Sequence, residues 1–174
     1  MVTELSLSPP RGSLRQGAVY PGIPVFWIPD NMAILRPHGE TDWLSIRGHP
    51  LREVHDRFRL GDGVESVVVH AKARPVVVLS NDGELRRSQP VRVVPLYSYR
   101  TGTFADRERG TIEAGRMAHL LHVKARGALR EGFLNLREAS SVPRDFFEDA
   151  EPVADLDQLS VATLLRHFAT YIAA

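Results

Sequence analysis

The feature that most constrains the fold is an arginine followed by an unbroken apolar run and a polar turn. Residues 75–79 (Pro-Val-Val-Val-Leu) are apolar and mostly β-branched, which favours a strand that is covered on both faces. Residues 81–83 (Asn-Asp-Gly) are of the types that favour a turn. Arg74 stands before Pro75, and the proline holds it in an extended conformation. The segment therefore predicts a buried strand with a solvated guanidinium at its mouth, where it can bind phosphate.

Short strand candidates occur along most of the chain, separated by turn residues. They lie at residues 15–20, 64–70, 75–79, 91–96, 120–123 and 133–136. Strands this short, with few long helices between them, favour a small antiparallel barrel over alternating βαβ units. At 174 residues and 43% hydrophobic, the chain is long enough for one well-formed core. We therefore predict a mainly β fold with helices (α+β) and a single domain over residues 1–174.

Several segments depart from this strand pattern. Residues 1–13 are predicted to be a flexible N-terminus, and residues 100–116, rich in charge and glycine, a mobile loop. Residues 21–63 are rich in proline and glycine and form a long insertion after the first strand. Within it, Pro50 suits the first position of a short helix. Both tryptophans also lie in this insertion, where we expect them to anchor it as a satellite cluster.

The carboxyl end has the apolar spacing of a helix. Asp157 or Ser160 can cap it. The apolar positions at helical spacing are Leu164, Leu165, Phe168, Tyr171 and Ile172. We expect this helix to cover the open face of the barrel.

The net charge of +1 conceals a strong asymmetry along the chain. Residues 86–130 contain ten basic and three acidic residues, whereas residues 145–174 carry a net charge of −5. A basic middle can hold a polyanion through phosphate contacts, although arginines on a solvated face are the simpler alternative. There is no cysteine, which excludes disulfides and thiolate chemistry. Residues 1–13 lack a continuous apolar core, so we expect no signal peptide, no membrane span and a cytoplasmic protein.

The usual catalytic signatures are missing. There is no Walker loop, Rossmann glycine pattern, Gly-x-Ser-x-Gly elbow or His-Glu-x-x-His motif, which counts against several large enzyme classes. His119 and His122 are three apart in a strand-like stretch, so their side chains point to opposite faces and do not readily share a metal. We expect a satisfied or solvent-facing pair. His70 lies four residues before Arg74 and can serve as a general base near a phosphate. No metal or cofactor is predicted.

Several segments resemble the MazF/PemK family. Residues 15–20 are similar to the Gly-Asp-Val-Tyr-like opening strand of that family, and residues 73–82 to its Arg-Pro-Val-Leu-Val strand with an Asn-Asp-like turn. Residues 91–96 are similar to the next strand, which closes near a Thr or Ser. Residues 121–125 and 127–136 resemble later family segments, and the final helix fits as well.

The resemblance implies an SH3-like barrel that forms a homodimer and acts as the toxin of a toxin–antitoxin pair. Such a protein cleaves single-stranded RNA without metal and is kept in check by a cognate antitoxin. In the family the Arg before Pro contacts the scissile phosphate, and that position is Arg74 here. A Thr or Ser at the end of the next strand assists the reaction. The matching position falls on Tyr97 in the simplest register, with Ser98 one residue beyond, and a one-residue slip moves a side chain to the opposite face.

The chemistry can also be argued from the residues. Metal-free cleavage of RNA uses the 2′-hydroxyl as nucleophile, so the protein must align it, stabilise charge on the phosphorane and move two protons. Arg74 suits the charge role because its fork matches phosphate oxygens. The candidates for proton transfer are His70, Tyr97 and Ser98. Candidate RNA contacts nearby are Lys72, Arg86, Arg87 and Arg100. The alternative function is a non-catalytic RNA- or protein-binding module on the same barrel.

Overall fold

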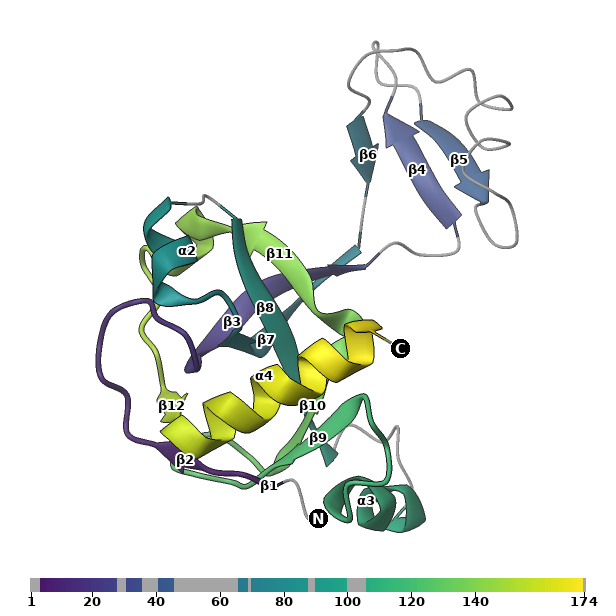
Figure 1. Ribbon diagram of the computed structural model, residues 1–174. Helices are drawn as coiled ribbons and strands as arrows, with labels where there is room; N and C mark the ends of the chain where they lie inside the picture. The colour runs from purple at the N-terminus through teal and green to yellow at the C-terminus, as the bar shows by residue number, and fades with distance from the viewer. Residues whose placement is uncertain are drawn as a thin grey trace. The chain divides into compact units, whose positions relative to one another are not determined.

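The chain forms two compact units. The computed structural model (Figure 1) describes residues 4–27, 31–35, 41–45, 66–68, 70–87, 90–99 and 106–173. One unit comprises Met1–Val25 and Ala73–Ala174, and the other comprises Phe26–Lys72. The second unit overlaps most of the insertion predicted at residues 21–63. The prediction of a single domain over the whole chain stays a prediction.

A nine-stranded, mostly antiparallel sheet dominates the described residues. Its strand order is β1-β9-β10-β8-β7-β3-β12-β2, and β11 pairs with β8 off this path. The strands are β1 Glu4–Leu5, β2 Leu7–Ser8, β3 Ala18–Trp27, β7 His70–Val78, β8 Pro90–Ser98, β9 Leu120–Val123, β10 Gly132–Asn135, β11 Ser140–Pro143 and β12 Ala154–Leu156. The two strands at the ends of the order, β1 and β2, are separated in the chain by Ser6 alone.

Helices complete a mixed α+β fold, as the sequence predicted at this coarse level. The α-helices are α2 Asp82–Arg87, α3 Asp106–Glu113 and α4 Gln158–Ala173, and the 3-10 turns are η2 Leu136–Glu138 and η3 Arg144–Phe147. In the Phe26–Lys72 unit, β4 Asn31–Leu35 pairs antiparallel with both β5 Thr41–Ser45 and β6 Ser66–Val68. Among the described helices, none is both long enough and apolar enough to cross a membrane. The predicted helix at Pro50 lies outside the described residues.

Strand β7 is covered on both faces, as its apolar run predicted. Val76 and Val78 are fully buried in one hydrophobic cluster. Val77 and Leu79 alternate with them and belong to the other main cluster. Because successive side chains of a strand point to opposite faces, a continuous apolar run is what a strand between two cores requires. Arg74 is partly exposed, as predicted. Its place at the mouth of the strand is corrected, because β7 begins at His70 and Arg74 lies in the middle of it.

The polar turn after β7 is the start of a helix. The Glu84 amide donates to the Asn81 side-chain oxygen at 2.9 Å, and the Asn81 amide donates to the Glu84 carboxylate at 3.2 Å. This reciprocal arrangement is a capping box, which satisfies amides at a helix N-terminus. The prediction of a plain turn was therefore incomplete, because Asn81 and Glu84 together begin α2.

The final helix forms where the sequence predicted it, with Asp157 as its cap. The Ser160 amide donates to the Asp157 carboxylate at 2.7 Å, while the Ser160 hydroxyl accepts a hydrogen bond from the Ser6 amide at 2.8 Å. Leu164 is buried in the main core, and Val161, Phe168 and Tyr171 pack against it. Figure 1 shows α4 lying across the strands of the sheet.

The apolar stripe of this helix is narrower than predicted. Ile172 is 65% exposed and Leu165 is only partly buried. Both follow directly after a residue that packs on the core, so each is rotated by about 100° around the helix from that contact.

Two further expectations are corrected. Residues 4–8, within the segment expected to be flexible, form β1 and β2 and pair with β9 and β12. The segment 100–116, expected to be a mobile loop, contains α3, although residues 100–105 lie outside the described part. Ile112 of α3 is fully buried against Leu120 and Phe133, and this contact holds the helix on the sheet.

Candidate functional site

Arg74 faces Tyr97 across two paired strands. The register of β7 and β8 pairs Val76 with Pro95, so continuing it by two residues sets Arg74 opposite Tyr97. The Arg74 guanidinium carbon lies 4.1 Å from the centroid of the Tyr97 ring. A guanidinium over an aromatic face is attracted by the ring quadrupole. Of the two residues that the sequence left open, Tyr97 is therefore the one that faces Arg74 across the strands.

The Tyr97 hydroxyl is hydrogen-bonded to a carboxylate. It donates a hydrogen bond to Glu138, which lies in η2. Burial, followed by the bond to Glu138 and its charge, raises the pKa of the Tyr97 hydroxyl, and the nearby Arg74 charge only partly opposes this. A phenol that holds its proton this firmly is a weak acid at neutral pH. In this arrangement Tyr97 supports the Arg74 guanidinium.

Arg74 and Ser98 nevertheless line one cavity of about 270 Å³. Its wall also includes Arg130 and five mostly apolar residues: Ala73, Pro75, Leu96, Ala128 and Leu129. Gly132 lies beside it, paired with Ser98. A Cβ atom at Gly132 would lie 1.9 Å from the Tyr97 carbonyl oxygen, so only glycine lets β10 approach β8 this closely.

Of the other predicted site residues whose side chains are described, Lys72, Arg86 and Arg87 are not among the residues that line this cavity. His70 begins β7, but its side chain lies outside the described part of the chain, as does Arg100. Lys72 is exposed on β7. Arg86 and Arg87 are exposed in the last turn of α2. The roles proposed for these residues in RNA binding and proton transfer stay predictions.

A row of aromatic side chains extends from Tyr97 across the neighbouring strands. Phe133 on β10 is paired with Tyr97 on β8 and with His122 on β9, so the three side chains share one face of the sheet. The Tyr97 and Phe133 rings stack at 5.5 Å. Tyr99 continues the row, with its ring 5.6 Å from Phe133 and 5.9 Å from His122. The row thus connects the Arg74 cavity with His122.

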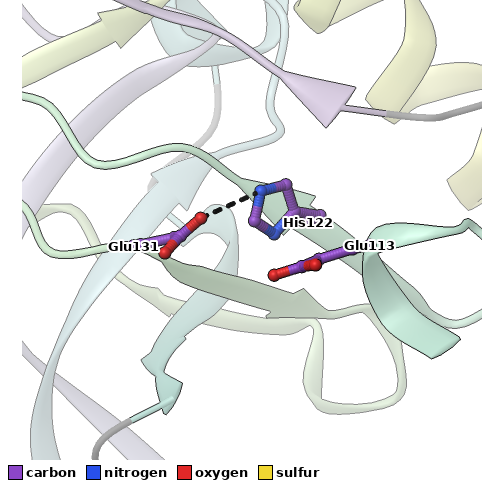
Figure 2. Close-up of side chains that lie close together, drawn as sticks. All are labelled: Glu113, His122 and Glu131. Carbon is purple, nitrogen blue, oxygen red and sulfur yellow. Dashed lines mark ion pairs between the residues drawn. The ribbon is translucent and has the colours of Figure 1, made fainter. Parts of the chain in front are cut away.

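His122 is the centre of a second polar cluster (Figure 2). Its ring is buried, at 5% exposure, and its Nδ1 lies 2.9 Å from the Tyr99 hydroxyl oxygen. Its Nε2 lies 3.5 Å from a carboxylate oxygen of Glu131, and Glu113 approaches from α3. The predicted alternative of a solvent-facing histidine is therefore wrong for His122, and the alternative of a satisfied one is right.

Arg109 joins the two carboxylates of this cluster. Its Nε donates to Glu113 at 2.6 Å, and its Nη2 donates to Glu131 at 2.6 Å. The same guanidinium lies 4.9 Å from the Tyr99 ring centroid. Two carboxylates and a histidine are also a donor set that suits a divalent metal. Here the guanidinium already neutralises the carboxylates, so a metal ion would have to displace Arg109.

A second cavity, of about 370 Å³, opens beside this cluster. The described residues that line it are Tyr99, Arg109, Ala125, Arg130 and Glu131. Neither His122 nor Glu113 is among these lining residues. Each instead contacts residues that do line the cavity: His122 contacts Tyr99 and Glu131, and Glu113 is bonded to Arg109. Arg130 lines this cavity and the cavity of Arg74 alike. The two cavities are therefore neighbours that share one arginine.

Burial favours the neutral form of His122. Burial lowers the pKa of the His122 ring, and the carboxylates of Glu131 and Glu113 only partly oppose this shift. Burial, and then the charge of Glu113, raises the pKa of the Tyr99 hydroxyl, with Arg109 opposing. At neutral pH the cluster thus contains an uncharged ring, a protonated phenol, two carboxylates and one guanidinium.

The sequence missed most of this cluster. Arg109 and Glu113 are four residues apart, a spacing that pairs them on a helix and was a usable signal for α3. Glu131 and Tyr99 gave no comparable signal, because they meet the cluster only through pairing between strands.

A buried neutral histidine makes stability depend on pH. The folded chain binds fewer protons at His122 than the unfolded chain, because the folded pKa is the lower of the two. The contribution of the neutral His122 ring to the free energy of unfolding is present above the unfolded pKa of about 6.5. It is lost as pH falls below that value, because the ring must then be protonated in the unfolded chain. We expect the melting temperature to drop between about pH 7.5 and about pH 5.5, and to drop less in His122→Gln. A variant that loses stability as steeply as the wild type would contradict this.

No protein-family model matches the chain, and no curated protein matches it at a significant level. The likeness to MazF/PemK proteins therefore depends on the sequence motifs described above.

Proposed function

We propose that this chain is a metal-independent endoribonuclease that cleaves single-stranded RNA, as a toxin of MazF/PemK type. The observation that carries the proposal is the cavity where Arg74, Ser98 and Arg130 meet, with Arg74 held over the Tyr97 ring. Two arginines among the residues that line one cavity favour the binding of phosphate, which guanidinium groups contact through paired N–H donors.

The proposed architecture is an SH3-like barrel. In support, the strands at the two ends of the sheet order are consecutive in the chain with one residue between them. A sheet whose end strands are this close in sequence favours a strongly curled shape. The buried clusters on both faces of β7 and the helix α4 on the main core agree with such a fold.

The proposed chemistry assigns charge stabilisation to Arg74 and Arg130. Negative charge accumulates on the phosphorane as the 2′-hydroxyl attacks, and guanidinium donors that are already oriented stabilise it at little reorganisation cost. The stacking on Tyr97, itself anchored by Glu138, orients Arg74 in advance. Ser98 is the hydroxyl among the residues that line this cavity.

The proposal includes partners and a location. An antitoxin protein that covers these cavities would block access of RNA to Arg74. A symmetric homodimer, the commonest form of soluble oligomer, and a cytoplasmic location complete the picture that the resemblance implies.

A non-catalytic RNA- or protein-binding module is the second candidate. One observation favours it: the hydroxyl that faces Arg74 is a phenol bound to Glu138, with a raised pKa, where the resemblance leads us to expect a Thr or Ser. Such a site can still bind phosphate while lacking a group for proton transfer.

We expect the purified protein to cut single-stranded RNA in the presence of EDTA. Attack by the 2′-hydroxyl leaves a cyclic 2′,3′-phosphate and a 5′-hydroxyl, so analysis of the product ends distinguishes this route from metal-dependent hydrolysis. Products with 5′-phosphate ends, or cleavage that EDTA abolishes, would contradict the metal-independent mechanism. Binding with a steep salt dependence but without cleavage would favour the binding module.

A further inference from the structure

We propose that the cavity lined by Tyr99, Arg109, Arg130 and Glu131 binds a ribonucleotide and recognises its 2′-hydroxyl, so that the chain prefers RNA to DNA. The inference rests on the proposed function, because it takes RNA as the ligand, and it concerns a cavity that the resemblance does not include. It requires an acceptor for the hydroxyl, donors for the phosphate and continuity with the cavity of Arg74.

Glu131 is the acceptor. It lines the cavity, and its side chain is 37% exposed, so a ligand can reach it. An ionised carboxylate only accepts hydrogen bonds, and it therefore selects a ligand group that donates one. The ribose 2′-hydroxyl is such a donor and is the group that distinguishes RNA from DNA. Arg109 donates a hydrogen bond to one carboxylate oxygen of Glu131. The His122 Nε2 lies 3.5 Å from the other oxygen (Figure 2).

Arg109 and Arg130 are the donors for phosphate. A guanidinium has five N–H donors, and the bonds to Glu113 and Glu131 use one at Nε and one at Nη2. The Arg109 side chain remains 42% exposed at the cavity. Arg130 is exposed and makes no ion pair within the described part of the chain. The cavity thus combines a carboxylate with cationic donors that are still free.

The two cavities form one path for an RNA strand. Arg130 lines both, so the two cavities together carry three arginines, with Arg74 in one, Arg109 in the other and Arg130 in each. A line of basic side chains beside aromatic residues is how single-stranded nucleic acids are commonly bound. A strand with one phosphate at Arg74 therefore brings a neighbouring nucleotide to Glu131.

The experiment compares affinities for RNA and DNA oligonucleotides of one sequence, by fluorescence anisotropy in EDTA. The Arg74→Ala background slows cleavage of the probe, so that binding alone is measured. We expect RNA to bind about tenfold more tightly than DNA, because a hydrogen bond to a charged group is worth roughly that factor. Adding Glu131→Ala should bring this ratio close to one, and Glu131→Gln, which keeps a weaker acceptor, should give an intermediate ratio.

Glu113→Ala is the matched control. It removes the other carboxylate that holds Arg109, but Glu113 is not among the residues that line the cavity. We expect it to weaken RNA and DNA binding together and to leave their ratio unchanged. Thermal melting of each variant establishes that it is folded, and Glu131→Gln carries the test if Glu131→Ala does not fold.

Three outcomes of the affinity measurements overturn the inference. The first is equal affinities for RNA and DNA in the Arg74→Ala background. The second is an RNA-to-DNA affinity ratio that stays the same when the Glu131 carboxylate is removed. The third is a ratio that Glu113→Ala brings to one as fully as Glu131→Ala does. Saturable binding of Zn²⁺ or Mn²⁺ that is lost in Glu131→Gln also overturns it, because the carboxylate would then be a metal ligand. Wild-type protein that prefers RNA but does not cut it disproves the nuclease and leaves this inference standing. If the wild type cuts RNA but Glu131→Ala leaves the RNA-to-DNA affinity ratio unchanged, the nuclease proposal stands and this inference is overturned.

Discussion

Arg74→Ala should lower the rate of RNA cleavage about a hundredfold or more, which is the typical loss when one stabiliser of transition-state charge is removed. The fold should persist, because Arg74 is partly exposed and its contact is with the surface of one ring. Arg74→Lys keeps the charge but loses the planar fork and the stacking on Tyr97, so an intermediate rate is expected. Single-turnover cleavage and the melting temperature are the two measurements.

Arg86→Ala is the matched control for charge. Arg86 is an exposed arginine that does not line the cavity of Arg74. Its loss should weaken binding slightly and leave the rate at saturating RNA unchanged. A variant Arg74→Ala that cuts as fast as the wild type would show that the cavity of Arg74 is not where RNA is cleaved.

Leu164→Ala should destabilise the chain by about 2–5 kcal/mol, the usual cost of removing a large buried aliphatic side chain. Leu164 is 1% exposed and belongs to the main core, where it joins α4 to the sheet. Ile172→Ala, in the same helix, should cost little because Ile172 is 65% exposed. Urea unfolding of the two variants gives the difference. Similar losses for both would mean that α4 does not pack through Leu164.

Much of the fold followed from local patterns. The strand at β9 and the core of β7 lie where short apolar runs predicted them, and α4 begins directly after its predicted cap, Asp157. Strand propensity, alternation and capping involve residues within a few positions of one another, so a single sequence contains them. The errors were also local in origin. The capping box of Asn81 and Glu84 was taken for a turn, and the charged segment around α3 for a loop.

The candidate site was predicted in part. Arg74 and Ser98 do line one cavity, and Tyr97 is in contact with Arg74. The cluster around His122 was not predicted, because its members come from α3, β9 and the segments flanking β8 and β10. Ile112 of α3 is buried against the sheet, and Arg109 on the same helix bonds Glu113 and Glu131.

The amino-acid sequence by itself determined the local elements of this protein and the place of Arg74 directly before the apolar run of β7, because these depend on neighbouring residues. Tertiary structure alone decided which side chain faces Arg74. The choice between Tyr97 and Ser98 is a matter of register, and register depends on how β7, β8 and β10 pair along their length. The close approach of β10 at Gly132 and the sharing of Arg130 by two cavities follow from the same pairing. Such contacts join residues distant in sequence, whose separation no local pattern encodes.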